Sequence, residues 1–94
     1  MPSNFRIHIT SHFKRDAQRV ITQNPELGIA LEQVKSILTQ DPYNKTRRFD
    51  IKKLKNIEAG KGQWRIRVGK YRLRYDILDK DIILYSFCHR KEAY

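Results

Sequence analysis

The stretch WRIRVGKYRLRY, from Trp64 to Tyr75, alternates arginines with apolar or aromatic residues on both sides of a Gly-Lys pair. Such alternation is typical of β-strands that bury one face, and Gly at the first position of a two-residue loop favours a hairpin turn. The stretch therefore predicts two antiparallel strands, residues 63–68 and 71–78, joined at Gly69-Lys70.

The predicted turn fixes which residues lie opposite one another across the hairpin. Val68 pairs with Tyr71, and every later pair follows from that register. One face of the hairpin is then apolar, and we expect it to lie under helices. This face carries Trp64, Ile66, Leu73, Tyr75 and Ile77.

The opposite face of the hairpin carries four arginines. Arg67 lies opposite Arg72, and Arg65 lies opposite Arg74. Each directly opposed pair of like charges destabilises a sheet by about 0.2–1 kcal/mol. Asp76 is the only acidic residue in these two strands, and it can pair with only one arginine. We expect a bound phosphate backbone to offset the repulsion.

The amino-terminal half of the chain predicts a strand followed by two helices. FRIHIT, residues 5–10, alternates apolar and polar side chains as a strand does. A first helix is expected to follow, with Thr10 or Ser11 as its cap. The sequence NPE then predicts a second helix, with Asn24 as its cap and Pro25 in its first turn, ending at Asp41-Pro42.

The remaining segments complete an α+β domain. Residues 43–63 form a basic connector with a short strand or turn near residues 51–54, and residues 82–89 predict a last strand after a turn at Asp79-Lys80. The expected order is β-α-α-β-β-β, with a helical hairpin packed on one face of a small, mainly antiparallel sheet. We expect residues 1–94 to form a single domain.

The last strand has two possible registers. With a two-residue or four-residue turn, Ile83, Tyr85, Phe87 and His89 join the arginine side of the sheet, whereas a three-residue turn reverses the strand. Aromatic rings between arginines suit single-stranded RNA, because bases stack on the rings while phosphates pair with the guanidinium groups.

Charge and composition narrow the class of partner. The chain has a formal net charge of +10, which favours a polyanionic partner such as nucleic acid or an acidic protein. The one cysteine, Cys88, allows no internal disulfide, and we expect a cytoplasmic location. We expect no signal peptide and no membrane contact, because no apolar run approaches the length that spans a bilayer.

The candidate site needs neither a metal nor another cofactor. The sequence has no paired cysteines, no His-x-Glu and no acidic cluster with ligand spacing. If the protein cuts RNA, arginines would stabilise the charge that develops on phosphate, and His89 or Tyr94 would move protons. We expect His8 and His12 to be structural. The residues expected to contact RNA are Arg47, Arg48, Lys52, Lys53, Lys55, Lys70, Arg74, Tyr85 and Phe87.

These carboxy-terminal motifs resemble the RelE/ParE superfamily, the toxins of type II toxin–antitoxin systems. The resemblance runs from Leu54-Lys55 through Trp64–Tyr75 and the acidic turn at residues 79–81 to His89-Arg90 and Tyr94. It covers nearly the whole chain, and it favours the RelE-like branch.

The resemblance implies a ribosome-dependent endoribonuclease that cuts mRNA in the A site by attack of the 2′-hydroxyl on the adjacent phosphate. By position it implies catalytic roles for Arg65, Arg67, Arg72, Arg90 and Tyr94, and His89 is added because some branches use a histidine in this region. Arginine stands at residues 65 and 67 where RelE-like toxins often carry lysine. Arginine scarcely deprotonates, so proton abstraction must come from another residue.

The resemblance also implies partners: a cognate acidic antitoxin encoded nearby, mRNA and the ribosome, and DNA only indirectly through the antitoxin complex. Two alternatives remain open. ParE-like members act on DNA gyrase, and a non-catalytic RNA- or protein-binding module could keep the same fold.

Overall fold

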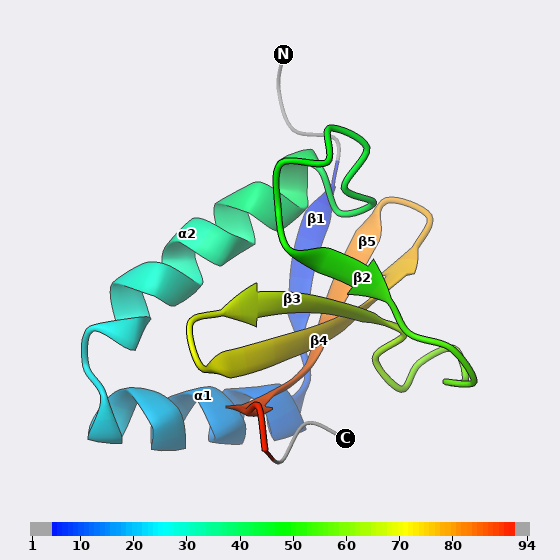
Figure 1. The fold of residues 1–94 in the computed structure, drawn as a ribbon. Helices are drawn as coiled ribbons and strands as arrows, with labels where there is room; N and C mark the ends of the chain where they lie inside the picture. The colour runs from blue at the N-terminus through cyan, green and yellow to red at the C-terminus, as the bar shows by residue number, and fades with distance from the viewer. Residues whose placement is uncertain (1–4, 92–94) are drawn as a thin grey trace.

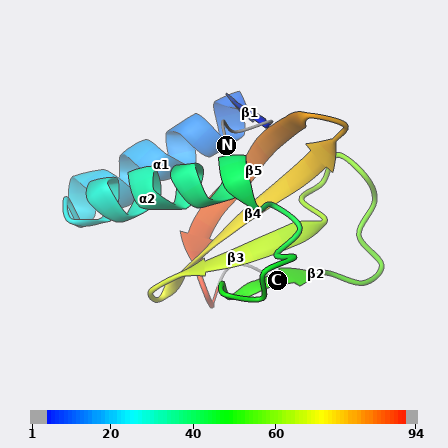
Figure 2. The same ribbon diagram turned by 90° about the horizontal axis from the view of Figure 1, so that it is seen from above.

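The computed structural model describes residues 5–91, which form two helices and a five-stranded sheet (Figure 1). Both helices cover the same face of the sheet, as the view from above shows (Figure 2). The elements in chain order are β1 Arg6–Ile9, α1 Ser11–Gln23, α2 Leu27–Gln40, β2 Ile51–Lys53, β3 Trp64–Val68, β4 Tyr71–Leu78 and β5 Asp81–His89.

The sheet has the strand order β1-β5-β4-β3-β2. β1 runs parallel to β5, and the other neighbouring strands are antiparallel. The α+β prediction is therefore confirmed, and the connector supplies the short strand β2 as the edge next to β3.

One predicted helix boundary, the start of α2, differs in the structure. Thr10 caps α1, because its hydroxyl oxygen accepts the Phe13 N–H at 3.0 Å. The prediction that Asn24 caps α2 is wrong. The Asn24 N–H donates to the Val20 carbonyl and closes α1, and α2 begins three residues later, after Glu26. Asp41 ends α2 as predicted.

The core lies between the helices and the apolar face of the sheet. α1 contributes Phe13, Ala17 and Val20, and α2 contributes Leu31, Val34 and Leu38. The sheet contributes Ile66, Val68, Leu73, Tyr75, Ile82, Leu84 and Phe87. The apolar hairpin face predicted from the alternation is thus the face that packs on the helices.

Both predicted turns are present. Gly69 has φ +61° at the first position of the β3–β4 turn, a conformation that glycine adopts without strain. Val68 pairs with Tyr71, Arg67 with Arg72 and Arg65 with Arg74, so the predicted register is confirmed.

A β-bulge divides β5 into two parts with different registers. Before the bulge, Ile83 pairs with Asp76 and Leu84 with Tyr75; after it, Ser86 pairs with Arg74 and Phe87 with Leu73. The extra residue is Tyr85. Since one added residue reverses the alternation, every later side chain of β5 changes face.

The bulge corrects the prediction for the end of β5. Tyr85 lies on the arginine side as expected, but Phe87 is fully buried in the core. His89 pairs with Tyr71, on the helix side of the sheet, and the two rings make an edge contact with centroids 5.4 Å apart.

Neither helix in the described part of the chain is long and apolar enough to cross a membrane.

Candidate functional site

Four arginines on the side of the sheet opposite the helices make the candidate surface, which we call the arginine face: Arg65, Arg67, Arg72 and Arg74. They come from the adjacent strands β3 and β4 in two directly opposed pairs. Lys52 of β2 lies opposite Arg65 and continues the same row of positive charge.

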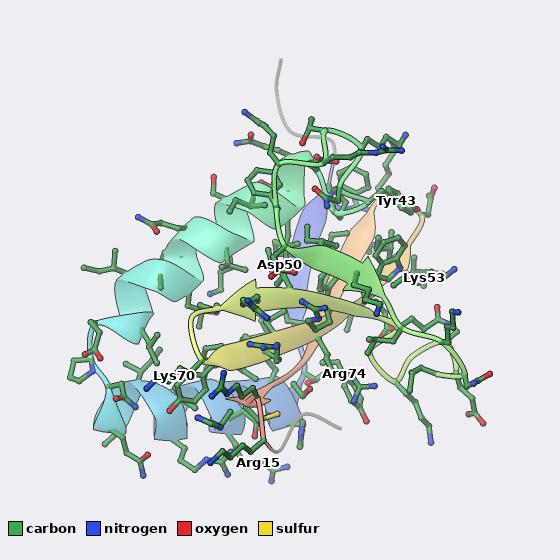
Figure 3. The ribbon with its side chains drawn as sticks, in the orientation of Figure 1. Arg15, Tyr43, Asp50, Lys53, Lys70 and Arg74 are labelled. Carbon is green, nitrogen blue, oxygen red and sulfur yellow. The ribbon has the colours of Figure 1, made fainter. Side chains whose placement is uncertain are left out.

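Asp50, just before β2, neutralises part of the arginine face (Figure 3). Its Oδ1 lies 2.9 Å from Arg65 Nη1 and its Oδ2 lies 3.1 Å from Arg67 Nε. The carboxylate that pairs with these two arginines therefore comes from outside the hairpin and not from Asp76.

Asp76 instead organises the loop that leads into β3. Its carboxylate accepts three backbone N–H groups, from Gly60 at 3.2 Å, Gly62 at 2.9 Å and Gln63 at 3.1 Å. Gly60 and Gly62 have φ +88° and +76°, so this loop needs residues without a β-carbon. The buried carboxylate thus fixes the loop over one end of β4.

Arg74 connects that loop to the bulge. Its Nε donates to the Gly62 carbonyl at 3.0 Å and its Nη2 to the Lys61 carbonyl at 2.7 Å. The guanidinium also lies over the Tyr85 ring, 5.7 Å from its centroid. Arg74 and Tyr85, both predicted to contact RNA, are therefore in contact with each other.

Arg72 is more deeply buried than the other three arginines of this face. It is buried, with 8% of its surface exposed, and its Nη1 donates to the Gly69 carbonyl at 3.3 Å and to the Tyr71 carbonyl at 3.1 Å. Among the ion pairs of the described residues, none involves Arg72. Its positive charge is therefore not balanced by a carboxylate within residues 5–91.

The remaining basic residues predicted to bind RNA are spread around the arginine face rather than gathered on it. Lys53 turns to the other side of the sheet, where its ammonium lies 5.7 Å from the Trp64 ring centroid. Tyr43 packs on the same ring from the loop after α2 (Figure 3). Lys70 is exposed in the β3–β4 turn, and Lys55, Arg47 and Arg48 are exposed in loops.

The site residues predicted near the carboxy terminus have different surroundings where the structure describes them. Arg90 is exposed just after β5, and its N–H donates to the Lys70 carbonyl at 2.9 Å. His89 is half-buried, and its Nδ1 accepts the Lys91 N–H at 3.2 Å. Tyr94 lies outside the described residues. The buried Phe87 has no surface to offer to RNA.

Besides Asp50, sequence reasoning gave no site role to Asp16 and His12, which the fold places beside Arg74. Asp16, in α1, is nine-tenths buried, and its Oδ2 accepts the Phe87 N–H of β5 at 3.0 Å. His12 Nε2 lies 3.2 Å from the same oxygen. The i, i+4 spacing of this acid and histidine on a helix was the available signal.

Burial and hydrogen bonding shift the pKa of two groups that lie outside the arginine face. Burial raises the pKa of the Tyr75 hydroxyl far above its usual value, and the charge of Asp41 adds to the effect. The hydrogen bond from His8 and the ion pair with Arg6 lower the pKa of Asp81. The described residues contain no group of three His, Cys, Asp or Glu side chains able to hold a metal ion.

Comparisons with known proteins agree with the fold. A family model described as the ParE toxin of the type II toxin–antitoxin system parDE matches residues 7–94. The archaeal RelE of a RelE–RelB complex from Pyrococcus horikoshii OT3 is similar, with a TM-score of 0.68 at 23% identity over 96% of this chain and 99% of that one.

Two further structures have the same fold. The RelB–RelE complex from Methanococcus jannaschii gives a TM-score of 0.62 at 26% identity, covering 92% of this chain and 93% of that one. The E. coli DinJ–YafQ complex gives 0.75 at 14% identity, covering 96% and 98%. A search of curated proteins found no match. The match to the family model over almost the whole chain shows that the protein belongs to the ParE family of type II toxin–antitoxin toxins.

Proposed function

We propose that this toxin is a metal-independent endoribonuclease that cuts mRNA on the ribosome. The reaction would be attack of a 2′-hydroxyl on the adjacent phosphorus, which forms the O2′–P bond and breaks the bond from phosphorus to the 5′-oxygen. The attacking hydroxyl loses a proton and the leaving 5′-oxygen gains one. Such a reaction needs a positively charged site for the phosphate and groups that transfer protons.

The observation that carries the proposal is the buried charge of Arg72. A buried guanidinium without a carboxylate is costly, and a bound phosphate compensates it by forming charge-assisted hydrogen bonds. Arg67 lies directly opposite and adds a second positive charge. Arg65 and Arg67 share Asp50, so an incoming phosphate competes with that carboxylate for them. Of the opposed pair Arg67 and Arg72, Arg72 is therefore the one without a carboxylate partner among the described residues.

Proton transfer is assigned to His89 and Tyr94 in this proposal. Because His89 Nδ1 accepts the Lys91 N–H, the neutral ring carries its proton on Nε2. To protonate the leaving oxygen, the His89 ring would first have to take up a proton on Nδ1, in place of the Lys91 N–H, and the imidazolium would then donate its Nε2 proton. Arg90, next to His89 in the chain, would contact the phosphate.

A cognate antitoxin would be the protein partner. The solved relatives include RelE–RelB and DinJ–YafQ toxin–antitoxin complexes. The formal charge of +10 favours an acidic antitoxin segment laid over or beside the arginine face.

The second candidate function is inhibition of DNA gyrase. It is favoured by one finding, that the matching family model is that of ParE toxins rather than RelE toxins. It requires no RNA chemistry of the arginine face.

Two assays on the same preparation separate these functions. The first follows a defined mRNA by primer extension in a purified translation system, with and without ribosomes. The second measures supercoiling of relaxed plasmid by purified gyrase. A new 3′ end that requires ribosomes supports the ribonuclease proposal. Intact mRNA together with lost supercoiling supports the gyrase function and overturns the ribonuclease proposal.

A further inference from the structure

A polar pocket lies between α1 and the bulged part of β5. Its volume is about 320 Å³, and it is lined by His12, Asp16, Arg19, Arg74, Tyr85, Ser86 and Cys88. It exists because β1 pairs with β5 only as far as Leu84. Beyond that residue the edge of β5 is left to α1, which brings its own side chains next to the arginine face.

Asp16 holds the two elements together at the base of the pocket. Its Oδ2 accepts the Phe87 N–H, which would otherwise be an unpaired donor at the edge of the strand. The carboxylate also lies 3.2 Å from His12 Nε2 and 3.6 Å from Arg19 Nη2. The negative charge of Asp16 is thus satisfied within the wall of the pocket.

The walls of the pocket have excess positive charge. Arg19 contributes one guanidinium from α1, with 58% of its side chain exposed, and Arg74 contributes another from β4. Among the lining residues within 5–91, Asp16 is the one carboxylate beside these two guanidinium groups, so the lining favours an anion.

An aromatic wall adjoins the charges. The Tyr85 ring has two neighbours here: the Arg74 guanidinium, 5.7 Å from its centroid, and the His12 ring, with centroids 5.9 Å apart at an interplanar angle of 37°. Arg74 and Tyr85 also line a second hollow, of about 350 Å³, with Asn56, Glu58 and Lys61. Arg74 and Tyr85 are therefore lining residues of both hollows.

We propose that the pocket between α1 and β5 binds one nucleotide of single-stranded RNA, with the phosphate between Arg19 and Arg74 and the base against Tyr85. Guanidinium groups for a phosphate beside an aromatic ring for a base are the combination by which proteins hold single strands. The volume is at the low end for a small-ligand pocket, which suits one nucleotide. The inference rests on the proposed RNA substrate and names a second point at which that substrate is held.

The test measures binding and cleavage separately. Binding uses a fluorescent single-stranded RNA with 2′-O-methyl groups, which cannot be cut by 2′-hydroxyl attack, over a series of salt concentrations. The variant is Arg19→Gln. The matched control is Lys14→Gln, which removes one positive charge from the opposite side of the same helix, where Lys14 lines a different groove.

We expect Arg19→Gln to weaken binding about tenfold, as the loss of one charge-assisted contact does. It should also reduce the slope of log K against log salt by about 0.7, the value for one phosphate contact to a single strand. Lys14→Gln should leave both quantities near wild type. A second pair, Tyr85→Leu against Tyr43→Leu, tests the aromatic wall, and only Tyr85→Leu should weaken binding.

The proposal is overturned if Arg19→Gln and Lys14→Gln have equal effects, or if the wild-type protein does not bind the RNA. Primer extension distinguishes this failure from failure of the proposed function. If mRNA is cut on the ribosome but Arg19→Gln and Lys14→Gln weaken RNA binding equally, the nucleotide pocket is ruled out and the ribonuclease proposal stands. If only Arg19→Gln loses RNA binding and the wild-type protein cuts no mRNA, the nucleotide pocket is supported and the ribonuclease proposal is ruled out.

Discussion

Arg67 lies directly opposite Arg72 across β3 and β4, yet only Arg67 has a carboxylate partner among the described residues. The sheet therefore holds two like charges side by side and balances one of them. Directly opposed like charges cost about 0.2–1 kcal/mol per pair, and burial of Arg72 adds to that cost. An anion bound between these two arginines would offset that cost.

Replacing Asp50 should strengthen RNA binding. Asp50→Asn removes the carboxylate shared by Arg65 and Arg67 and frees both for phosphate. We expect tighter binding of single-stranded RNA, with a steeper dependence on salt because more phosphate contacts form. Asp79→Asn is the matched control, since Asp79 is exposed in the turn between β4 and β5. Equal tightening in both variants would mean that net charge alone controls binding.

Gly62→Ala should destabilise the loop before β3 more than Gly60→Ala. Both glycines have positive φ, so each substitution costs about 1–2 kcal/mol in backbone conformation. A β-carbon at Gly62 would also lie 2.9 Å from both Arg74 Cβ and Tyr85 Cδ2, whereas one at Gly60 meets nothing within 4 Å.

The difference between these variants isolates the contact with Arg74 and Tyr85. Overpacking costs about 1–3 kcal/mol, so urea unfolding should give a lower free energy of unfolding for Gly62→Ala by about that amount. Gly60→Ala should keep RNA binding at the wild-type level. Equal stabilities would show that the loop accommodates the methyl group by moving.

Tyr75→Phe should lower stability while leaving the arginine face intact. The Tyr75 hydroxyl is buried and donates to the Pro42 carbonyl at 2.7 Å, which ties β4 to the end of α2. Its loss leaves a buried carbonyl without that donor, at a cost of about 1–3 kcal/mol. Thermal unfolding measures the effect, with Tyr43→Phe, at an exposed tyrosine, as the control. A wild-type unfolding temperature for Tyr75→Phe would contradict this role.

Asp41 should contribute a pH-dependent part of the stability. Burial raises its pKa, but hydrogen bonds from the Thr46 hydroxyl and from the Thr46 and Lys45 N–H groups outweigh burial and lower the pKa overall. A folded pKa below the unfolded value of about 3.9 stabilises the fold above that pH. The contribution is lost as pH falls through the folded pKa.

Urea unfolding of wild type and Asp41→Asn between pH 6 and pH 2 measures this contribution. The difference in free energy of unfolding should be constant above about pH 5 and should shrink below about pH 4. The other carboxylates cancel in the difference. A difference that does not change with pH would rule out the lowered pKa.

The hairpin was predictable because a two-residue turn with alternating side chains fixes its own register. Arg65, Arg67, Arg72 and Arg74 lie where the alternation placed them. The short strand β2 was also visible, as a possible strand in the connector.

The end of β5 was not predictable by the same rule. The bulge at Tyr85 adds one residue, and no local turn signal reports it. It moves Phe87 into the core and His89 to the helix side, so the aromatic row expected on the arginine face is reduced to Tyr85.

The ion pairs depended on tertiary structure rather than on strand alternation. Asp50 comes from the connector, 15 residues before Arg65, and Asp76 turns away to bind backbone N–H groups of a loop. The pocket beside α1 forms only because β1 is shorter than β5. Such relations are absent from any local window of sequence.

Arg72→Ala should reduce mRNA cleavage more than Lys45→Ala. Removal of a group that stabilises charge on the reacting phosphate typically lowers the rate by about 10²–10³. Lys45 lies in the loop after α2, over the Tyr43 ring, and carries the same charge. Circular dichroism must show that both variants remain folded. Equal losses would mean that the arginine face acts as a general electrostatic surface.

Primer extension on a defined mRNA, with purified ribosomes and the wild-type toxin, tests the central claim most directly. We predict a new 3′ end at the A-site codon that is absent without ribosomes and strongly reduced with Arg72→Ala. Intact mRNA in the presence of ribosomes and folded toxin would contradict it.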